Sequence, residues 1–161
     1  MDNYGDKAPV IHHLTKEFMF IGEFRHNLDN KGRLAIPAKF RKNLAPKAII
    51  TRGLDNCLFI YPQKDWESLL QKLMNLPLSQ ANSRAFARFM LAGATETELD
   101  SQGRILIPDY LRKFANLNKK AVIAGLNNRI EIWDENNWID YKSKTEKEAT
   151  EIAEKLSGLG I

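Results

Sequence analysis

The chain has 161 residues, 43% of them hydrophobic and 27% charged, and a formal net charge of +4, values typical of a folded protein rather than a disordered one. No apolar stretch approaches the roughly 18 residues that cross a bilayer, so no membrane partner is expected. One cysteine, Cys57, excludes an internal disulfide and, without a CxxC or Cys/His spacing, a structural zinc site. We expect Cys57 to be a buried strand residue of a cytoplasmic protein.

The sequence of residues 1–74 predicts a flexible extension followed by strands, turns and helices. The polar segment at the start fits neither a signal peptide nor a membrane anchor. Gly32 is free to adopt a positive φ in the turn between the first two strands, and Pro37 ends the second strand and fits the first turn of a helix. In chain order the segments are the extension 1–18, strand 20–28, turn 29–32, strand 33–37, helix 38–44, strands 48–51 and 57–61, and helix 62–74.

The rest of the chain predicts a connecting helix, a second β-rich part and a terminal helix over 146–156. Ser79 is placed to cap the connecting helix and Gly93 to end it. The residues of the connecting helix expected to face inward are Ala85, Phe86, Phe89 and Met90. The terminal helix has only a thin apolar face of Ala149, Ile152 and Leu156, which is expected to fray or to dock on a neighbouring subunit. The chain thus divides into a flexible N-terminal extension (1–18), a first module (19–75), a linker and helix (76–93), a second module (94–141) and a C-terminal helix or tail (142–161).

An unusual ten-residue phrase occurs twice, as LDNKGRLAIP over 28–37 and LDSQGRILIP over 99–108. The similarity extends well beyond it, because GLDNCLFIYPQKDW later aligns with GLNNRIEIWDENNW in the same order. One module of about 50 residues is too small to bury a good core alone. We therefore predict a β-rich α+β fold in which two copies pair strand against strand, as an internal pseudo-dimer with flanking helices.

The common enzyme motifs are absent, so no catalytic residue, cofactor, metal ion or small-molecule substrate is expected. No GxxxxGK[ST] loop is present to hold phosphates and no GxSxG elbow to present a serine. In DNKGR the third and fifth positions of a calcium loop would be Lys31 and Arg33, both cationic. His26 has Thr97 at the matching position of the second copy, so no acid/base site is duplicated.

The repeated Asp-x-x-x-Arg spacing favours an ion pair within each turn. Asp29 and Asp100 can accept N–H bonds in their own turns and pair with Arg33 and Arg104. A purely structural role would explain this pattern. A functional role builds on it, because an arginine held by a carboxylate is preorganised and its fork matches O6 and N7 of guanine.

Charge favours the first copy as the contact surface for DNA. Basic residues far outnumber acidic ones between residues 19 and 52, whereas the end of the chain is acidic, although charge alone also fits a solvated surface. The second copy has Glu96 where the first has Arg25, and Ser101 where the first has Asn30. The candidate DNA-contacting residues are Arg33, Lys31, Arg25, Asn30, Arg104 and Gln102. The residues expected to orient the turns are Asp29, Gly32, Asp100 and Gly103.

The segments MFIGEFRHNLDNKGRLAIPAKFR, GLDNCLFIYP, LDSQGRILIP and EIWDENNW closely resemble the MraZ family of bacterial transcription regulators, from residue 19 to about 141. The resemblance implies tandem AbrB-like swapped-hairpin modules and assembly into a ring-shaped homo-oligomer. It also implies binding of double-stranded DNA at G-rich tandem repeats in the promoter of the division and cell-wall gene cluster, usually as a repressor. A cytoplasmic, nucleoid-associated protein is then expected.

Two rival functions remain open from the sequence. The chain could be a ring-forming scaffold or interaction protein with non-specific affinity for nucleic acid. RNA binding is disfavoured, because Phe20, Phe24 and Phe40 are best explained as core rather than as stacking platforms. The cations of the helix over 38–44 could meet phosphates, but we expect a solvated face; they are Lys39, Arg41 and Lys42.

Overall fold

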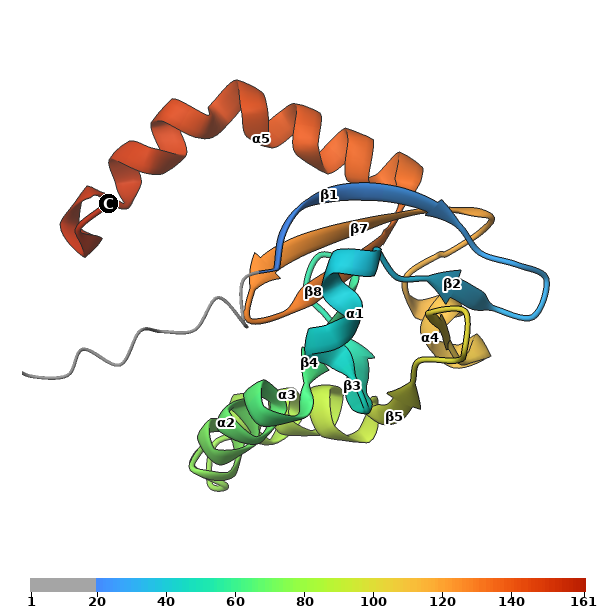
Figure 1. Ribbon diagram of the computed structural model, residues 1–161. Helices are drawn as coiled ribbons and strands as arrows, with labels where there is room; N and C mark the ends of the chain where they lie inside the picture. Colours follow the sequence, from blue (N-terminus) through green and yellow to red (C-terminus); the bar gives the residue numbers. More distant parts are fainter. Residues whose placement is uncertain (1–19) are drawn as a thin grey trace, which may run out of the picture.

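A computed structural model describes residues 20–161, so the predicted extension 1–18 lies outside the described residues. Within this range the chain forms eight strands and five α-helices (Figure 1). The strands are β1 (Phe20–Asn27), β2 (Arg33–Ala35), β3 (Lys47–Arg52), β4 (Leu58–Pro62), β5 (Thr95–Glu98), β6 (Arg104–Leu106), β7 (Lys120–Asn127) and β8 (Ile130–Asp134). The helices are α1 (Ala38–Leu44), α2 (Gln63–Met74), α3 (Ala81–Ala92), α4 (Asp109–Phe114) and α5 (Glu135–Lys155), followed by the 3-10 turn η2 (Ser157–Leu159).

The two copies exchange strands throughout. Six strands form one antiparallel sheet in the order β1-β7-β8-β4-β3-β5, and β2 pairs with β6 in a separate two-stranded ribbon. Strand β1 of the first copy pairs with β7 of the second from Phe20↔Asn127 to Asn27↔Lys120, and β5 of the second copy pairs with β3 of the first. Equivalent strands therefore occupy mirrored places in the order. The predicted tandem swapped-hairpin fold is confirmed.

Apolar side chains of both copies form a shared core between the large sheet and the ribbon. Leu34 and Ile36 of β2 and its flank are fully buried, as are their equivalents Ile105 and Ile107. The short helices add buried residues to the same cluster, Phe40 and Leu44 from α1 and Leu111 from α4. Because neither half of this core is complete alone, burial of apolar surface couples the folding of the two copies.

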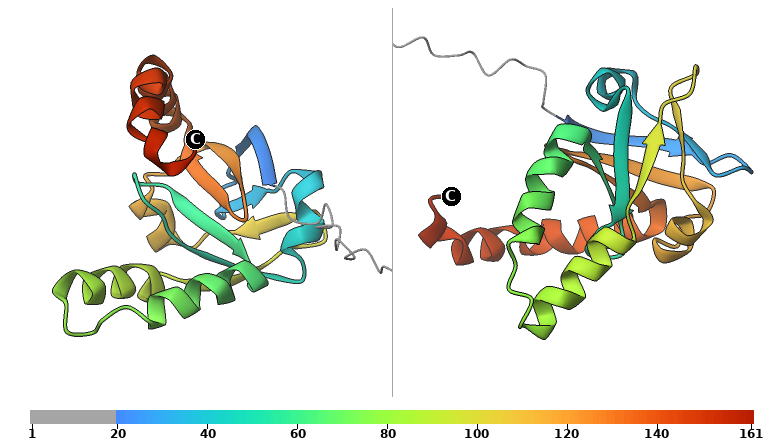
Figure 2. Two further views of the ribbon diagram at one scale, coloured as in Figure 1. Left: turned by 90° about the vertical axis from the view of Figure 1, so that its left-hand side faces the viewer. Right: turned by 90° about the horizontal axis from the view of Figure 1, so that it is seen from below.

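The opposite face of the sheet is covered by the longer helices. Cys57 is fully buried in a cluster with Phe59 and Trp133, as predicted, but it lies one residue before β4 rather than within a strand. Figures 1 and 2 show α5 at one end of the molecule and α2 with α3 at the other. No helix within residues 20–161 is both long and apolar enough to cross a membrane.

Two predictions about the connecting helix α3 are wrong. Its N-terminal cap is Gln80, without a side-chain hydrogen bond, rather than Ser79. Phe86 is 39% exposed and Ala85 is exposed, although Met90 is buried as predicted and the helix ends before Gly93. The reason is that the C-terminal end of α3 contacts the sheet, where the Thr51 hydroxyl donates to the Met90 carbonyl at 2.6 Å.

The predicted terminal helix is the second half of a longer one. Helix α5 begins at Glu135, where Asp134 accepts the Asn137 N–H at 3.1 Å, and so runs across the expected boundary between 141 and 142. The capping carboxylate starts the helix earlier than the apolar spacing suggested. Ala149 and Ile152 remain exposed, and Leu156 is half-buried.

Candidate nucleic-acid interface

The first Asp-x-x-x-Arg turn is closed by the carboxylate of Asp29. Its Oδ1 accepts the N–H groups of Lys31 and Arg33, each at 2.9 Å, and its Oδ2 accepts the Arg33 Nε–H at 2.6 Å. Gly32 has a φ of +82°, in the left-handed region that side chains disfavour. One acid therefore shapes the backbone of the turn and orients the arginine at the same time.

The second turn repeats this arrangement atom for atom. Asp100 Oδ1 accepts the N–H groups of Gln102 and Arg104 at 2.9 Å each, and Asp100 Oδ2 accepts the Arg104 Nε–H at 2.8 Å. Gly103 has a φ of +74°. The ion pair predicted for each turn is present in both.

Hydrogen bonding keeps both turn carboxylates ionised. The backbone N–H of Arg33, followed by its side chain and the Lys31 N–H, lowers the pKa of Asp29 from 3.8 to about 2 against the opposing effect of desolvation. The equivalent bonds from Arg104 and Gln102 lower the pKa of Asp100. At neutral pH each carboxylate is thus a permanent acceptor for its arginine.

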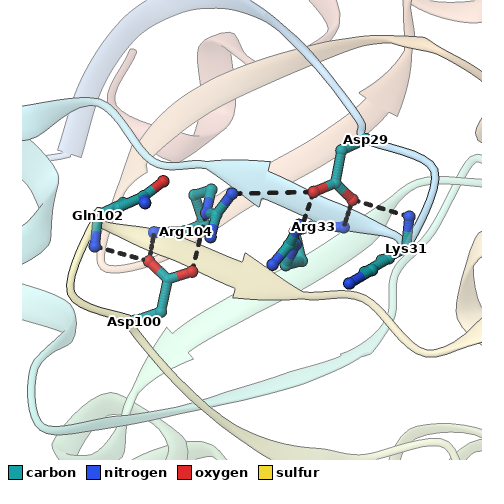
Figure 3. A network of polar contacts seen from close by, with 6 residues as sticks. All are labelled: Asp29, Lys31, Arg33, Asp100, Gln102 and Arg104. Atoms are coloured by element: carbon teal, nitrogen blue, oxygen red, sulfur yellow. Dashed lines mark hydrogen bonds and ion pairs between the residues drawn. The ribbon is translucent and has the colours of Figure 1, made fainter.

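The antiparallel β2–β6 ribbon has one turn at each end and brings the two arginines together between them (Figure 3). Arg33 lies opposite Leu106, and Arg104 lies opposite Ala35. The Ile36 N–H donates to the Gly103 carbonyl at 2.9 Å, so each strand continues onto the opposite turn. Two arginines far apart in the sequence come to lie side by side between their aspartates (Figure 3).

The two arginines are not equally engaged. Arg104 bonds Asp100 and also lies 3.9 Å, through Nη1, from Oδ2 of Asp29. Among residues 20–161, Arg33 has an ion pair with Asp29 alone, made through Nε. The terminal nitrogens of the Arg33 fork are therefore the more available pair.

The other candidate contacts of the first turn are exposed. Asn30 and Lys31 lie at its tip, and the Arg25 side chain on β1 is 53% exposed and 3.5 Å from Glu23. The second turn has Gln102 exposed in place of a lysine.

Strand exchange brings in two basic residues that sequence reasoning missed. The Leu28 N–H, directly before the first turn, donates to the Lys119 carbonyl at 2.7 Å, and Asn27 pairs with Lys120 across β1 and β7. Both lysines are exposed. They belong to the second copy, so only knowledge of the strand pairing could have placed them here.

The matching edge of the second turn is acidic instead. On β5 the carboxylates of Glu96 and Glu98 lie 3.7 and 4.0 Å from Lys47 Nζ. Positive charge is thus concentrated on the side of the first turn.

The expectation of a wholly solvated face on α1 is wrong for one residue. Lys39 and Lys42 are exposed, the former 4.8 Å from the centroid of the Phe24 ring. Arg41 is half-buried, and its Nε donates to the Ile36 carbonyl at 2.8 Å. It turns inward because a backbone acceptor lies within reach.

No group of three or more His, Cys, Asp or Glu side chains in the described part of the chain is placed to hold a metal ion. The chemistry that the turns do offer is hydrogen-bond donation from oriented guanidinium groups on a two-stranded ribbon.

Comparison with known proteins gives the family. The family model described as "MraZ protein, putative antitoxin-like" matches residues 19–89 and again residues 90–158. The chain belongs to the MraZ family. Both matches together leave residues 1–18 outside the family pattern, and each contains one Asp-x-x-x-Arg turn.

Individual MraZ proteins are similar over nearly their whole length. The protein of Halothermothrix orenii is 52% identical over 143 residues, 89% of this chain and 100% of the relative. That of Natranaerobius thermophilus is 51% identical over 143 residues with the same coverage, and that of Desulforamulus reducens 50% over 141 residues, 88% of this chain and 99% of the relative. All three are named "Transcriptional regulator MraZ".

Proposed function

We propose that this MraZ family member is a transcription regulator that binds double-stranded DNA sequence-specifically through the β2–β6 ribbon. The observation that carries the proposal is the pair of aspartate-anchored arginines side by side on that ribbon. A two-stranded antiparallel ribbon fits the major groove of B-DNA, where the arginine fork matches guanine O6 and N7. Prior anchoring reduces the rotamer entropy lost on binding.

Arg33 is the principal base contact in this proposal. Its terminal nitrogens are less engaged than those of Arg104, and cations surround its turn. Lys31 and Arg25 meet phosphates and fix the register of the protein on the duplex. The remaining contacts come from the polar side chains of Asn30 in the first turn and Gln102 in the second.

The proposed function includes the DNA sequence that is bound and the oligomer that binds it. One ribbon carries two arginines and so specifies only a few guanines, which supports a target of short G-rich tandem repeats. A ring-shaped homo-oligomer that meets several repeats converts weak individual contacts into avidity. The resemblance supports repression of the division and cell-wall gene cluster by such a nucleoid-associated assembly.

One observation favours the rival function of a ring-forming scaffold with non-specific affinity for nucleic acid. Helix α5 carries exposed apolar residues, including Ile139, Tyr141 and Ile152. A shallow apolar hollow of about 190 Å³ runs along the same helix from Trp138 to Ala149. Such a surface suits contact with another copy of the chain whether or not the ribbon reads DNA.

The test compares a duplex with three tandem G-rich repeats against a scrambled duplex at fixed physiological salt. We expect Arg33→Ala to stay folded and lose about 1–3 kcal/mol of discrimination per contacted guanine, and Arg104→Ala to lose less. Arg88→Ala, on α3 and away from the ribbon, is the charge-matched control and should keep full discrimination. Equal binding of both duplexes by the parent chain would refute the regulator and favour the scaffold.

A further inference from the structure

We propose that Arg41 and Arg112 are positioning residues, each of which holds the turn of the opposite copy in place for DNA reading. This inference rests on the proposed function. It assigns a role to two arginines outside the Asp-x-x-x-Arg signature, one on α1 and the other at the equivalent place on α4.

Each guanidinium lies directly against the glycine of a turn. A Cβ added at Gly32 would lie 2.8 Å from Cζ and 2.9 Å from Nε of Arg112. A Cβ added at Gly103 would overlap the guanidinium of Arg41. Glycine is therefore required at both positions for two reasons: the backbone has a positive φ, and an arginine side chain fills the space that a Cβ would occupy.

The contacts cross between the copies. Arg41 belongs to the first copy but covers the second turn, and Arg112 belongs to the second copy but covers the first. Arg41 is tied to that turn through one residue: its Nε donates to the Ile36 carbonyl at 2.8 Å, and the Ile36 N–H donates to the Gly103 carbonyl at 2.9 Å. The position of the turn thus depends on a helix from the other half of the chain.

The Arg112 contact is held mainly by packing. The Ile107 N–H donates to the Gly32 carbonyl at 2.9 Å, repeating the backbone link, but the buried Nε of Arg112 has no hydrogen-bond partner among the described residues. Leaving a buried donor unsatisfied costs free energy. The guanidinium is kept in this place by close contact with the Gly32 turn and by Asp109 on the same helix, whose Oδ1 lies 3.8 Å from Arg112 Nη2.

Direct contact with DNA phosphates is the competing role, and the orientation of the side chains argues against it. Both arginines are half-buried, whereas the next residue on each helix, Lys42 or Lys113, is exposed. The Lys113 side chain is 77% exposed. Substitution of either lysine is a matched control, because it removes one positive charge from the same helix and leaves the arginine contact with the turn intact.

The crossed arrangement makes an unusual prediction for binding. Arg112 contacts the turn of Arg33, which is the principal base contact in the proposed function. Arg112→Met should therefore reduce discrimination between the tandem-repeat and scrambled duplexes by about 5- to 30-fold, the size expected when the interaction free energy between two contacting residues is lost. Arg41→Met should reduce it less. Lys42→Met and Lys113→Met should leave the discrimination ratio unchanged.

Salt dependence separates positioning from phosphate contact. A positioning residue leaves the salt slope of binding to the scrambled duplex unchanged, while a phosphate contact lowers the slope on both duplexes by about one. A slope lowered in this way for Arg112→Met would overturn the proposal.

Amide hydrogen exchange of the DNA-free protein gives a readout independent of the proposed function. Arg112→Met should speed exchange of the Lys31 and Arg33 amides, and Arg41→Met that of the Gln102 and Arg104 amides, with near-ultraviolet circular dichroism confirming the fold. Arg112→Lys serves if the methionine variant unfolds, and should show the same change in smaller degree. Exchange that is unchanged at the opposite turn, or that changes only at the turn of the same copy, overturns the positioning role even if the parent chain discriminates normally.

Discussion

Substituting alanine for Gly32 tests how tightly the first turn is constrained. Gly32 has a φ of +82°, and an alanine held in the left-handed region costs about 1–2 kcal/mol. Its Cβ would also lie 2.8 Å from Cζ of Arg112, so the guanidinium must move away at a further cost of about 1 kcal/mol. The expected loss in the free energy of unfolding is therefore about 2–3 kcal/mol.

Urea unfolding followed by circular dichroism measures this loss against a matched control. Gly158 has no heavy atom within 4 Å of an added Cβ, so Gly158→Ala should change stability by less than about 0.5 kcal/mol. In an Arg112→Met background the crowding is relieved, and Gly32→Ala should cost about 1 kcal/mol less than in the parent. A Gly32→Ala variant as stable as the Gly158→Ala control would refute the reasoning.

Four further outcomes are expected. The pKa of Asp29 is lowered to about 2 in the fold, so its contribution to stability is complete above its ordinary value of 3.8 and lost as pH falls through 2; a carboxyl NMR titration with a midpoint near 3.8 would contradict this. Burial raises the pKa of the Cys57 thiol, so iodoacetamide at pH 8 should modify it in urea but not in the native protein. Glu23 accepts the Trp138 Nε1–H at 2.9 Å and lies 3.0 Å from a lysine on α5, so Glu23→Ala should lower the unfolding free energy by about 1 kcal/mol and alter tryptophan fluorescence, and an unchanged spectrum would argue against the contact. Phe86→Ser should lower the free energy of unfolding by only about 1 kcal/mol, because the residue is 39% exposed; a loss of about 3 kcal/mol or more, as for a fully buried phenylalanine, would show that it packs inward.

The local chemistry of the turns was predictable because it depends on neighbours in the sequence. An acid four residues before an arginine, with glycine between them, already implies the carboxylate bonds seen in both copies. Duplication of the phrase likewise implied that the copies would complete each other's core. The β-rich internal pseudo-dimer followed from the duplication, and the swapped-hairpin fold from the resemblance to the MraZ family.

Long-range features were less accessible, because strand exchange decides them. Lys119 and Lys120 reach the first turn only through the pairing of β7 with β1. The contact of Arg41 with Gly103 likewise joins residues from different copies. Apolar spacing misjudged α3 for a related reason, since periodicity shows which face of a helix is apolar but not how much of its length meets the sheet.

Fusion of two unequal copies gives the β2–β6 ribbon a direction. A ribbon assembled from two identical chains would present the same turn at both ends, and it would bind a duplex equally well after rotation by half a turn. Here one end presents Lys31 and the other Gln102, with basic residues beside the first and acidic residues beside the second. Under the proposed function, a ribbon with two different ends would distinguish a site from its inverted copy, and identical subunits arranged head to tail would follow repeats that all point the same way.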